Sequence, residues 1–125
     1  MASTLAGQRI LVVEDEAIIA MLLEDIMEEI GCAIVGPVAK VAQGLAALDA
    51  GQVDGAVLDV NLSGEWSYPI ADALAARGVP YVFVTGYGQA GLAVDYRDHP
   101  VVQKPFTRTS IERGLEAAMA RVSNG

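Results

Sequence analysis

Short apolar runs alternate with helix-like patterns five times along the chain. The apolar runs are residues 10–13, 34–38, 55–58, 81–84 and 101–103. Between the first two, apolar residues recur at helical spacing at Ile19, Leu22, Leu23, Ile26 and Ile30. Five strand–helix units with apolar strands predict a parallel sheet covered on both faces by helices. Right-handed crossovers would make this a doubly wound, three-layer α/β domain.

Glycine and proline mark where the predicted helices begin and end. The helices are expected at residues 16–30, 41–50 and 68–77, and from Thr107 or Thr109 to near the C-terminus. Gly31 is a natural terminator of the first, and the Tyr68-Pro69 step suits the start of the third. Residues 86–99 are rich in glycine and weakly periodic, which predicts a short or mobile helix.

The last helix carries its own start signal. Thr109 and Glu112 have the spacing of a capping box, in which each side chain bonds the other residue's backbone N–H. The inward-facing residues of this helix are expected to be Ile111, Leu115, Ala118 and Met119.

Four of the apolar runs end in a polar group of a different chemical kind. The groups are Glu14-Asp15, Asp59, Thr85-Gly86 and Lys104-Pro105-Phe106. The carboxyl ends of parallel strands lie at one edge of the sheet, where open α/β folds bind ligands. Carboxylates, a hydroxyl and an ammonium at that edge predict a site for a divalent cation and a phosphoryl group.

The acidic residues of this edge favour magnesium. Glu14, Asp15 and Asp59 offer hard oxygen ligands, which suit Mg²⁺ better than zinc or copper. Without a cation their charges would repel one another. Taken singly, each has a plainer interpretation, since Asp15 could cap the first helix and Thr85 or Lys104 could be an ordinary surface residue.

Asp59 is the candidate nucleophile, because a carboxylate can form an acyl phosphate and its strand is the middle one in sequence. Lys104 would neutralise the transferred group and Thr85 would donate a hydrogen bond to it.

These motifs resemble the receiver domain of two-component response regulators, over nearly the whole chain and in the family's order and spacing. The resemblance implies the flavodoxin-like (βα)5 fold with strand order 2-1-3-4-5. It implies that Asp59 accepts the phosphoryl group and that Asp15, Asp59 and the backbone carbonyl of Asn61 ligate Mg²⁺, with Glu14 acting through water. Thr85 and Lys104 would bind phosphoryl oxygens. The Lys104-Pro105 peptide bond is expected to be cis.

A narrower resemblance involves Phe83-Val84-Thr85-Gly86-Tyr87 together with Lys104-Pro105-Phe106. It is similar to the mostly stand-alone receivers named for a Phe-Ala-Thr-Gly-hydrophobic-Tyr/Gly motif, although Val84 replaces the alanine. Some of that group act in stress signalling.

One position departs from the family's pattern. Typical receivers carry an aromatic residue three positions before the lysine, and its ring turns inward when the threonine engages phosphate. This chain has Val101 there. Tyr87 is the candidate replacement in a switch with Thr85 and Gly86; an ordinary loop tyrosine is the alternative. Trp66 is interpreted as a half-buried loop anchor, with a contact for a partner protein as the alternative, and His99 as a surface-loop residue.

Composition narrows the class of protein. The chain has 125 residues and a net charge of −8, so it is expected to form one domain over residues 1–125, without an output domain and without a surface for nucleic acid. Its one cysteine, Cys32, allows no internal disulfide. Without a signal peptide or membrane span in the sequence, we expect a cytoplasmic protein.

The expected function is a phosphorylation switch that is not otherwise an enzyme. Its partners would be a histidine kinase or histidine phosphotransfer protein and an unknown downstream protein, and the chain would be a monomer or weak dimer. A receiver fragment of a longer regulator and a phosphate-independent binding module are alternatives. A phosphohydrolase with an aspartyl nucleophile is a further alternative. Such enzymes usually have a second aspartate as acid/base where this chain has Asn61, which cannot transfer a proton.

Overall fold

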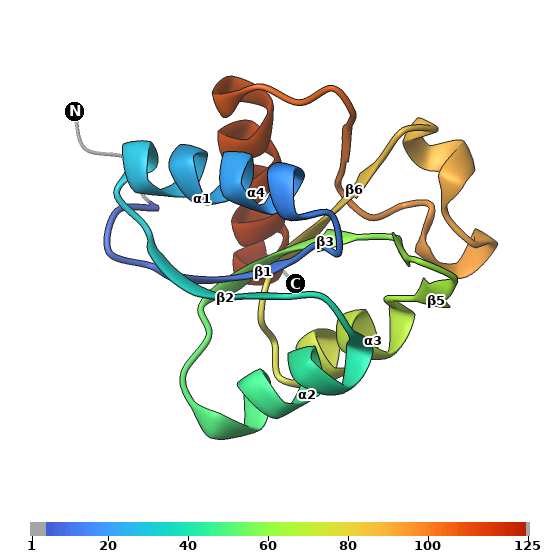
Figure 1. Cartoon of the computed structure of the whole chain (residues 1–125), viewed down its shortest axis with the longest axis horizontal. Coiled ribbons are helices and arrows are strands. Elements are labelled where there is room, and N and C mark those ends of the chain that lie inside the picture. Colours follow the sequence, from blue (N-terminus) through green and yellow to red (C-terminus); the bar gives the residue numbers. More distant parts are fainter. Residues whose placement is uncertain (1–4, 125) are drawn as a thin grey trace.

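A parallel sheet of five strands lies between two layers of helices in the computed structural model, which describes residues 5–124 (Figure 1). Its strands are β1 (Arg9–Val13), β2 (Ala33–Val38), β3 (Gly55–Asp59), β6 (Tyr81–Thr85) and β7 (Val101–Gln103). They lie in the order β2-β1-β3-β6-β7, with every neighbouring pair parallel. Counted along the five-stranded sheet alone, this is the predicted order 2-1-3-4-5, and the doubly wound α/β fold is confirmed.

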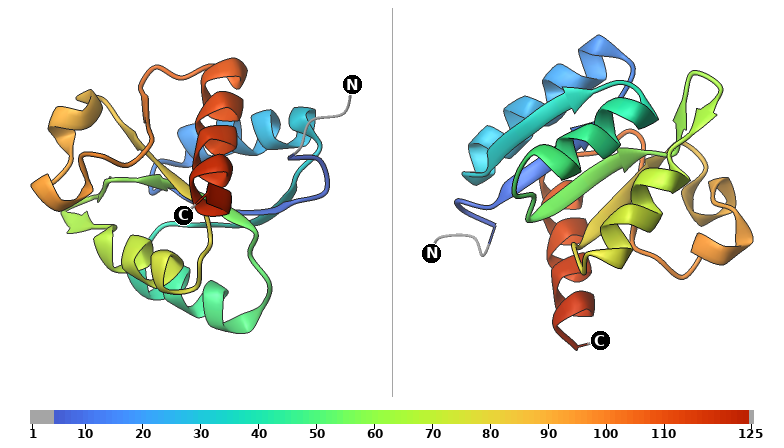
Figure 2. Two further views of the ribbon diagram at one scale, coloured as in Figure 1. Left: turned by 180° about the vertical axis from the view of Figure 1, so that it is seen from behind. Right: turned by 90° about the horizontal axis from the view of Figure 1, so that it is seen from below.

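Two helices cover each face of the sheet (Figure 2). Helices α1 (Ala17–Ile30) and α4 (Arg108–Asn124) lie on one face, and α2 (Val41–Ala50) and α3 (Tyr68–Ala76) on the other. Side chains alternate along each strand, so Val12 packs in the core under α1 and α4 while Leu11 and Val13 pack in the core under α2 and α3. Burial on both faces explains why the strands read as continuous apolar runs.

The glycine-rich segment after β6 forms two 3₁₀ helices, η1 (Gly88–Gly91) and η2 (Val94–Tyr96). The prediction that any helix here would be short is confirmed. This segment, coloured orange in Figures 1 and 2, lies beside a hairpin that follows β3.

That hairpin was not predicted. It consists of β4 (Asn61–Leu62) and β5 (Glu65–Trp66), paired antiparallel. Ser63 and Gly64 form its turn, with φ values of 55° and 93°. Strands of two residues are too short to show an alternating pattern, although a Ser-Gly step is a recognised turn signal.

The predicted capping box of α4 is wrong. Thr107, not Thr109, lies at the cap: its Oγ1 accepts a hydrogen bond from the backbone N–H of Ser110 at 3.1 Å, and the hydroxyl of Ser110 accepts from the N–H of Thr107 at 2.8 Å. The helix begins one residue after the cap, so the reciprocal bonds use Ser110 where the motif usually has Glu or Gln. Ile111, Leu115 and Ala118 are buried as predicted, and Met119 packs at the edge of the same core.

The Lys104–Pro105 peptide bond is cis, as predicted, and so is Gly36–Pro37. Among the described residues, 5–124, no helix has the length and apolar character needed to cross a membrane.

Candidate functional site

Four side chains from three strand ends meet at the carboxyl edge of the sheet. Glu14 and Asp15 directly follow β1, Asp59 is the last residue of β3, and Lys104 follows β7. Carboxylate oxygens of the three acids lie within 4.8 Å of one another. The Nζ of Lys104 is 3.5 Å from Oδ2 of Asp59 and 3.4 Å from Oε1 of Glu14. The structure therefore brings these four side chains together, as predicted.

Glu14 is the most deeply buried member of this acidic cluster, with a residue exposure of 3%. Burial, a hydrogen bond with Asp59 and the charge of Asp59 together raise the pKa of Glu14 to about 7. The backbone N–H of Glu16, which donates to Oε2 of Glu14 at 3.2 Å, and Lys104 offset only part of this rise. Glu14 and Asp59 therefore share a proton readily when no cation is bound.

The other two acids respond differently to their surroundings. Burial raises the pKa of Asp59, although the hydrogen bond with Glu14 and the charge of Lys104 oppose the rise. The pKa of Asp15 is lowered, chiefly by a hydrogen bond from the hydroxyl of Ser63. Burial disfavours the charged form of Lys104, but the charges of Asp59 and Glu14 outweigh it and raise the pKa of this ammonium.

Ser63 is a member of the site that sequence reasoning missed. It sits in the turn between β4 and β5, and its left-handed backbone aims the hydroxyl at Asp15. The Ser-Gly step could have revealed the turn, but not the contact across 48 residues of sequence.

Asn61, predicted to supply a backbone carbonyl, lies at the start of β4 beside Asp59. Its side-chain Oδ1 accepts a hydrogen bond from the N–H of Gly64 at 2.7 Å. The side chain is thus engaged in the turn, which leaves its backbone carbonyl as the atom of this residue to consider for a cation.

Thr85 ends β6 at the same edge and is buried. Its Oγ1 accepts a hydrogen bond from the N–H of Tyr87 at 3.2 Å. Gly91 of η1 lies directly against this hydroxyl, so a Cβ atom at residue 91 would stand 2.5 Å from Oγ1 of Thr85. The segment after β6 therefore covers the threonine.

The residues predicted to switch with Thr85 differ in exposure. Tyr87 is 79% exposed, and Gly86 has open space where a side chain would be. Val101 is half-buried and packs at the edge of the core under α2 and α3. That the Tyr87 ring moves when Thr85 engages phosphate stays a prediction.

An open cavity of about 280 Å³ connects these groups. Its lining includes Asp59, Asn61, Trp66, Thr85, Tyr87 and Lys104. Trp66 is 54% exposed and belongs to β5, where its ring stacks on Tyr68 at a centroid distance of 6.0 Å. Trp66 thus lines the site from a short strand and not from a loop, and it is more exposed than predicted, although its stacking on Tyr68 does anchor the ring.

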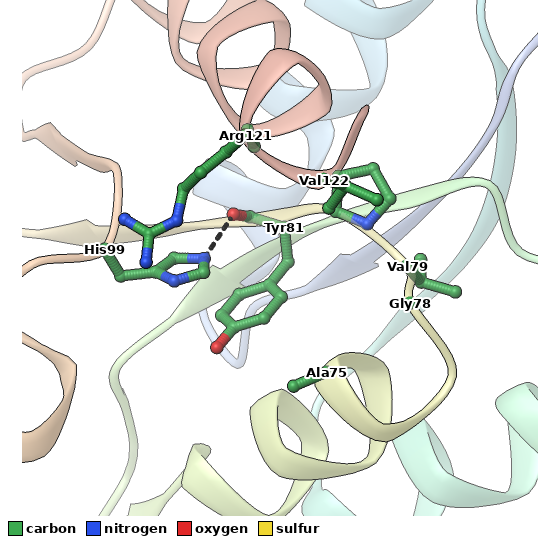
Figure 3. A pocket seen from close by; sticks show the side chains of 9 residues that line it. Ala75, Gly78, Val79, Tyr81, His99, Arg121 and Val122 are labelled. Atoms are coloured by element: carbon green, nitrogen blue, oxygen red, sulfur yellow. Dashed lines mark hydrogen bonds between the residues drawn. The ribbon is translucent and has the colours of Figure 1, made fainter. Parts of the chain in front are cut away.

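A second cavity, of about 170 Å³, lies at the opposite end of β6 (Figure 3). His99 lies in it, stacked on the Tyr81 ring at 3.9 Å, with Nε2 2.9 Å from the Tyr81 carbonyl oxygen. Burial lowers the pKa of His99. His99 lies in a loop, as predicted, but its ring is half-buried against Tyr81 and not free at the surface. It lies outside the acidic site, as predicted, because the ring packs at the other end of the strand.

The acidic cluster fits the requirements of Mg²⁺. The cation commonly uses one or two carboxylates and fills its other positions with water and phosphate oxygens. Asp15 and Asp59 offer such oxygens, and Ser63 keeps the pKa of Asp15 low, so its carboxylate is charged at neutral pH. The open cavity leaves room for water and a phosphoryl group.

Comparison with known proteins places this site in a family. Residues 10–116 match the response regulator receiver domain, so the chain belongs to that family. It is 45% identical to SdrG from Sphingomonas melonis Fr1, over 93% of this chain and 98% of that one, with a TM-score of 0.81. The receiver domain of PhyR from Erythrobacter litoralis is 26% identical over 92% of each chain, with a TM-score of 0.78.

A curated relative is longer than this chain. The transcriptional regulatory protein PdtaR from Mycobacterium tuberculosis is 27% identical over 124 residues, which make up 96% of this chain and 60% of PdtaR. The chain therefore spans about 60% of the length of the curated relative that it matches.

Proposed function

We propose that this receiver domain is a phosphorylation switch that accepts a phosphoryl group onto Asp59 from a phosphohistidine protein. The observation that carries the proposal is the arrangement of Asp59 at the end of β3, with Lys104 3.5 Å from its carboxylate and two further acids beside it. The similarity to SdrG, whose solved structures include a BeF₃-activated conformation, supports it.

In this reaction an oxygen of Asp59 forms a bond to phosphorus while the bond from phosphorus to the donor's histidine nitrogen breaks. The nitrogen keeps the electron pair of that bond. Lys104 stabilises the negative charge on the transferred group, and the hydroxyl of Thr85 donates a hydrogen bond to it. Water later attacks the phosphorus and restores the Asp59 carboxylate, so the domain catalyses only its own phosphorylation and dephosphorylation.

Asp15, Asp59 and the backbone carbonyl of Asn61 would hold Mg²⁺, with Glu14 acting through water. The bound cation would neutralise phosphoryl oxygens and reduce the repulsion between those oxygens and the carboxylates. Ser63 holds Asp15 in place for this role through its hydrogen bond.

Labelling with a small phosphodonor tests the reaction without knowledge of the partner. Acetyl phosphate and Mg²⁺ should add one phosphoryl group to the protein, visible as a mass increase that disappears with a chelator. Asp59→Asn should remain unlabelled, whereas Asp54→Asn, a matched change at an acid outside the cluster, should be labelled normally. A wild-type protein that takes up no phosphoryl group would favour the phosphate-independent binding module.

The donor protein needs a surface beside Asp59, and the start of α1 supplies one. Helix α1 begins two residues after Asp15, and its outward side chains Ile18 and Met21 are 80% and 62% exposed. Leu22 borders a groove of about 330 Å³ that reaches Pro105 and Phe106. Exposed apolar side chains grouped next to a reactive site are typical of a protein interface.

Charge substitution separates docking from chemistry. Ile18→Glu and Met21→Glu should each lower phosphotransfer from a phosphohistidine protein at least about tenfold, as loss of an interface anchor does. Labelling by acetyl phosphate should stay at the wild-type rate. Val122→Glu, at an exposed valine on α4, serves as the control. Equal loss with both donors would show that α1 affects the site itself and not docking.

After phosphorylation, rearrangement of Thr85 and the segment that covers it would change the surface offered to a downstream protein. Whether the domain carries a signal or drains phosphate depends on the lifetime of the aspartyl phosphate. Label that persists for an hour identifies a signal carrier, and label that vanishes within seconds identifies a shuttle or sink.

A further inference from the structure

The segment from Gly88 to Tyr96 contacts the rest of the molecule at several places, among them Thr85, Tyr68 and the core in which Leu92 is buried. At its first end Gly91 lies against the hydroxyl of Thr85, where a Cβ atom would approach to 2.5 Å. At its other end Tyr96 stacks on Tyr68, the first residue of α3, with ring centroids 4.3 Å apart and an angle of 13° between the rings. Movement of Thr85 and movement of this segment are therefore mechanically connected.

The contact between Tyr96 and Tyr68 is supported on several sides. The N–H of Ala93 donates to the hydroxyl oxygen of Tyr68 at 2.8 Å, and the hydroxyl of Tyr96 donates to Oδ1 of Asp72 at 2.7 Å. Both tyrosine rings also meet the buried ring of Phe83 edge-on. By contrast, the ring of Tyr87 in the same region is mostly exposed.

The stack also reaches the phosphoacceptor site. Tyr68 also stacks on the ring of Trp66, and Trp66 lines the cavity that contains Asp59 and Thr85. Tyr68 of α3 thus joins Tyr96 of this segment to Trp66 of the β4–β5 hairpin.

We propose that Tyr68 and Tyr96 are positioning residues that clamp residues 88–96 over Thr85 in the resting state, and that phosphorylation must release this clamp. The inference rests on the proposed phosphorylation of Asp59. In the resting state the Thr85 hydroxyl accepts from the N–H of Tyr87 and packs against Gly91. For the hydroxyl to reorient toward a phosphoryl oxygen, Gly91 and the residues joined to it must adjust, and the clamp opposes that adjustment.

The clamp predicts a linkage between the stack and the affinity of the site. A contact made only in the resting state lowers affinity for any ligand that needs the other state, so removing the contact raises the affinity. Tyr96→Leu should therefore bind beryllofluoride with Mg²⁺ at least about fivefold more tightly than wild type. A purely structural role would lower stability and leave the affinity unchanged.

Trp66 is the chain's one tryptophan, so its fluorescence can follow beryllofluoride binding, with calorimetric titration as a check. Amide hydrogen exchange supplies the second measurement. In wild type, the amide of Ala93 should exchange faster after beryllofluoride and Mg²⁺ are added, because the bond to Tyr68 is released. In Tyr96→Leu it should already exchange fast without the ligand.

Three further variants make the test specific. Tyr96→Phe keeps the ring and loses only the bond to Asp72, so its affinity should stay within about twofold of wild type. Val94→Ala removes a side chain of the same segment that is 73% exposed and lies outside the cavity, so its affinity should also stay within about twofold. Gly91→Ala displaces the segment from its other end and should raise the affinity as Tyr96→Leu does, which keeps the proposal testable if Tyr96→Leu does not fold.

The outcomes separate this inference from the proposed function. If wild type binds no beryllofluoride with Mg²⁺, the phosphorylation proposal fails. If wild type binds it and Tyr96→Leu and Gly91→Ala bind it equally well or more weakly, the clamp alone is overturned. An equal gain in affinity in Val94→Ala would show that any change in the segment loosens it, and would also overturn the clamp.

Discussion

The ammonium of Lys104 lies 3.5 Å from a carboxylate oxygen of Asp59, although 45 positions separate the two residues in the sequence. The same ammonium reaches Glu14 at 3.4 Å, so Lys104 links a buried acid, Glu14, with a largely buried one, Asp59. Parallel strands create this contact, because β3 and β7 end at the same edge of the sheet. The site is thus held together by charge as well as by the backbone.

Replacing the ammonium should damage phosphorylation more than folding. In Lys104→Met the side chain keeps its length, but the ammonium that stabilises the transferred group is lost, so labelling by acetyl phosphate should slow about 100-fold. The rate of the mass increase measures this effect. Lys40→Met changes the chain's other lysine, which is exposed at the start of α2, and should label normally. A Lys104→Met protein labelled at the wild-type rate would contradict the assigned role.

The raised pKa of Glu14 predicts how stability depends on pH without Mg²⁺. The folded state holds a proton on Glu14 up to about pH 7, whereas the unfolded chain loses it near 4.5. Between these values the folded state binds more protons, so the free energy of unfolding should fall as pH rises, by up to about 3 kcal/mol. Above pH 7 this contribution should be constant. The raised pKa of Asp59 acts in the same direction.

Urea unfolding at half-unit pH steps in chelator measures this slope. Glu14→Gln cannot lose a proton, so the decline between pH 4.5 and 7 should become distinctly shallower. Glu28→Gln, at an exposed glutamate of α1, should keep the wild-type slope. A wild-type free energy that rises with pH across this window would show that Glu14 is charged in the folded protein.

Mg²⁺ should reverse the destabilising repulsion among the acids. A ligand that binds only the folded state at 100 times its Kd raises the free energy of unfolding by about 2.7 kcal/mol. We expect an effect of this size at pH 8, and a smaller one at pH 6, where a proton on Glu14 competes with the cation. Asp15→Asn should weaken the Mg²⁺ effect strongly, while Asp25→Asn, at an exposed residue of α1, should retain it. Equal Mg²⁺ stabilisation of both variants would exclude Asp15 as a ligand.

The N-terminal cap of α4 gives a stability prediction that distinguishes Thr107, the cap in the structure, from Thr109, the cap of the sequence pattern. Thr107→Ala removes the acceptor for the N–H of Ser110 and should lower the free energy of unfolding by about 1 kcal/mol. Thr109→Ala, at the residue that the sequence pattern favoured, should change it by less than about 0.5 kcal/mol. Chemical denaturation of the two variants decides the matter, and a larger loss for Thr109→Ala would restore the capping box of the sequence pattern.

The strand ends could be predicted because they depend on a simple rule. Strands buried on both faces are continuous apolar runs, and the first polar residue after each run marks the sheet edge, which located Asp15, Asp59, Thr85 and Lys104. The hairpin after β3 could not be found this way, since its strands have two residues each.

The ring contacts could not be predicted from the sequence, for another reason. His99 on Tyr81 and Tyr96 on Tyr68 are pairs that only the folded chain brings together. In each pair one ring belongs to a predicted element, Tyr81 in β6 and Tyr68 in α3, but its partner lies in the segment between β6 and β7, which has no periodicity to show where its rings point. The same limit explains why Ser63 was overlooked beside Asp15.

The hairpin also supports the neighbouring helix, which yields the last prediction. Oε1 of Glu65 accepts a hydrogen bond from the N–H of Val41, the first residue of α2, at 2.9 Å. The preceding residue, Lys40, makes no side-chain capping bond. Glu65, from the hairpin, therefore accepts a backbone N–H at the start of α2 that a local cap would usually bind. Because a carboxylate near a helix N-terminus is favourable, Glu65→Ala should lower the free energy of unfolding by about 1 kcal/mol.

Glu65→Gln keeps an acceptor oxygen and should recover more than half of that loss, which separates the hydrogen bond from the charge. Amide exchange at Val41 gives a local measurement: the amide should exchange faster in Glu65→Ala than in Glu65→Gln, while amides in α4 should be unaffected. Equal exchange at Val41 in the two variants would show that the hydrogen bond to Glu65 does not hold α2, and the hairpin would then be held to the fold by its other side-chain contacts, among them those of Ser63 with Asp15 and of Trp66 with Tyr68.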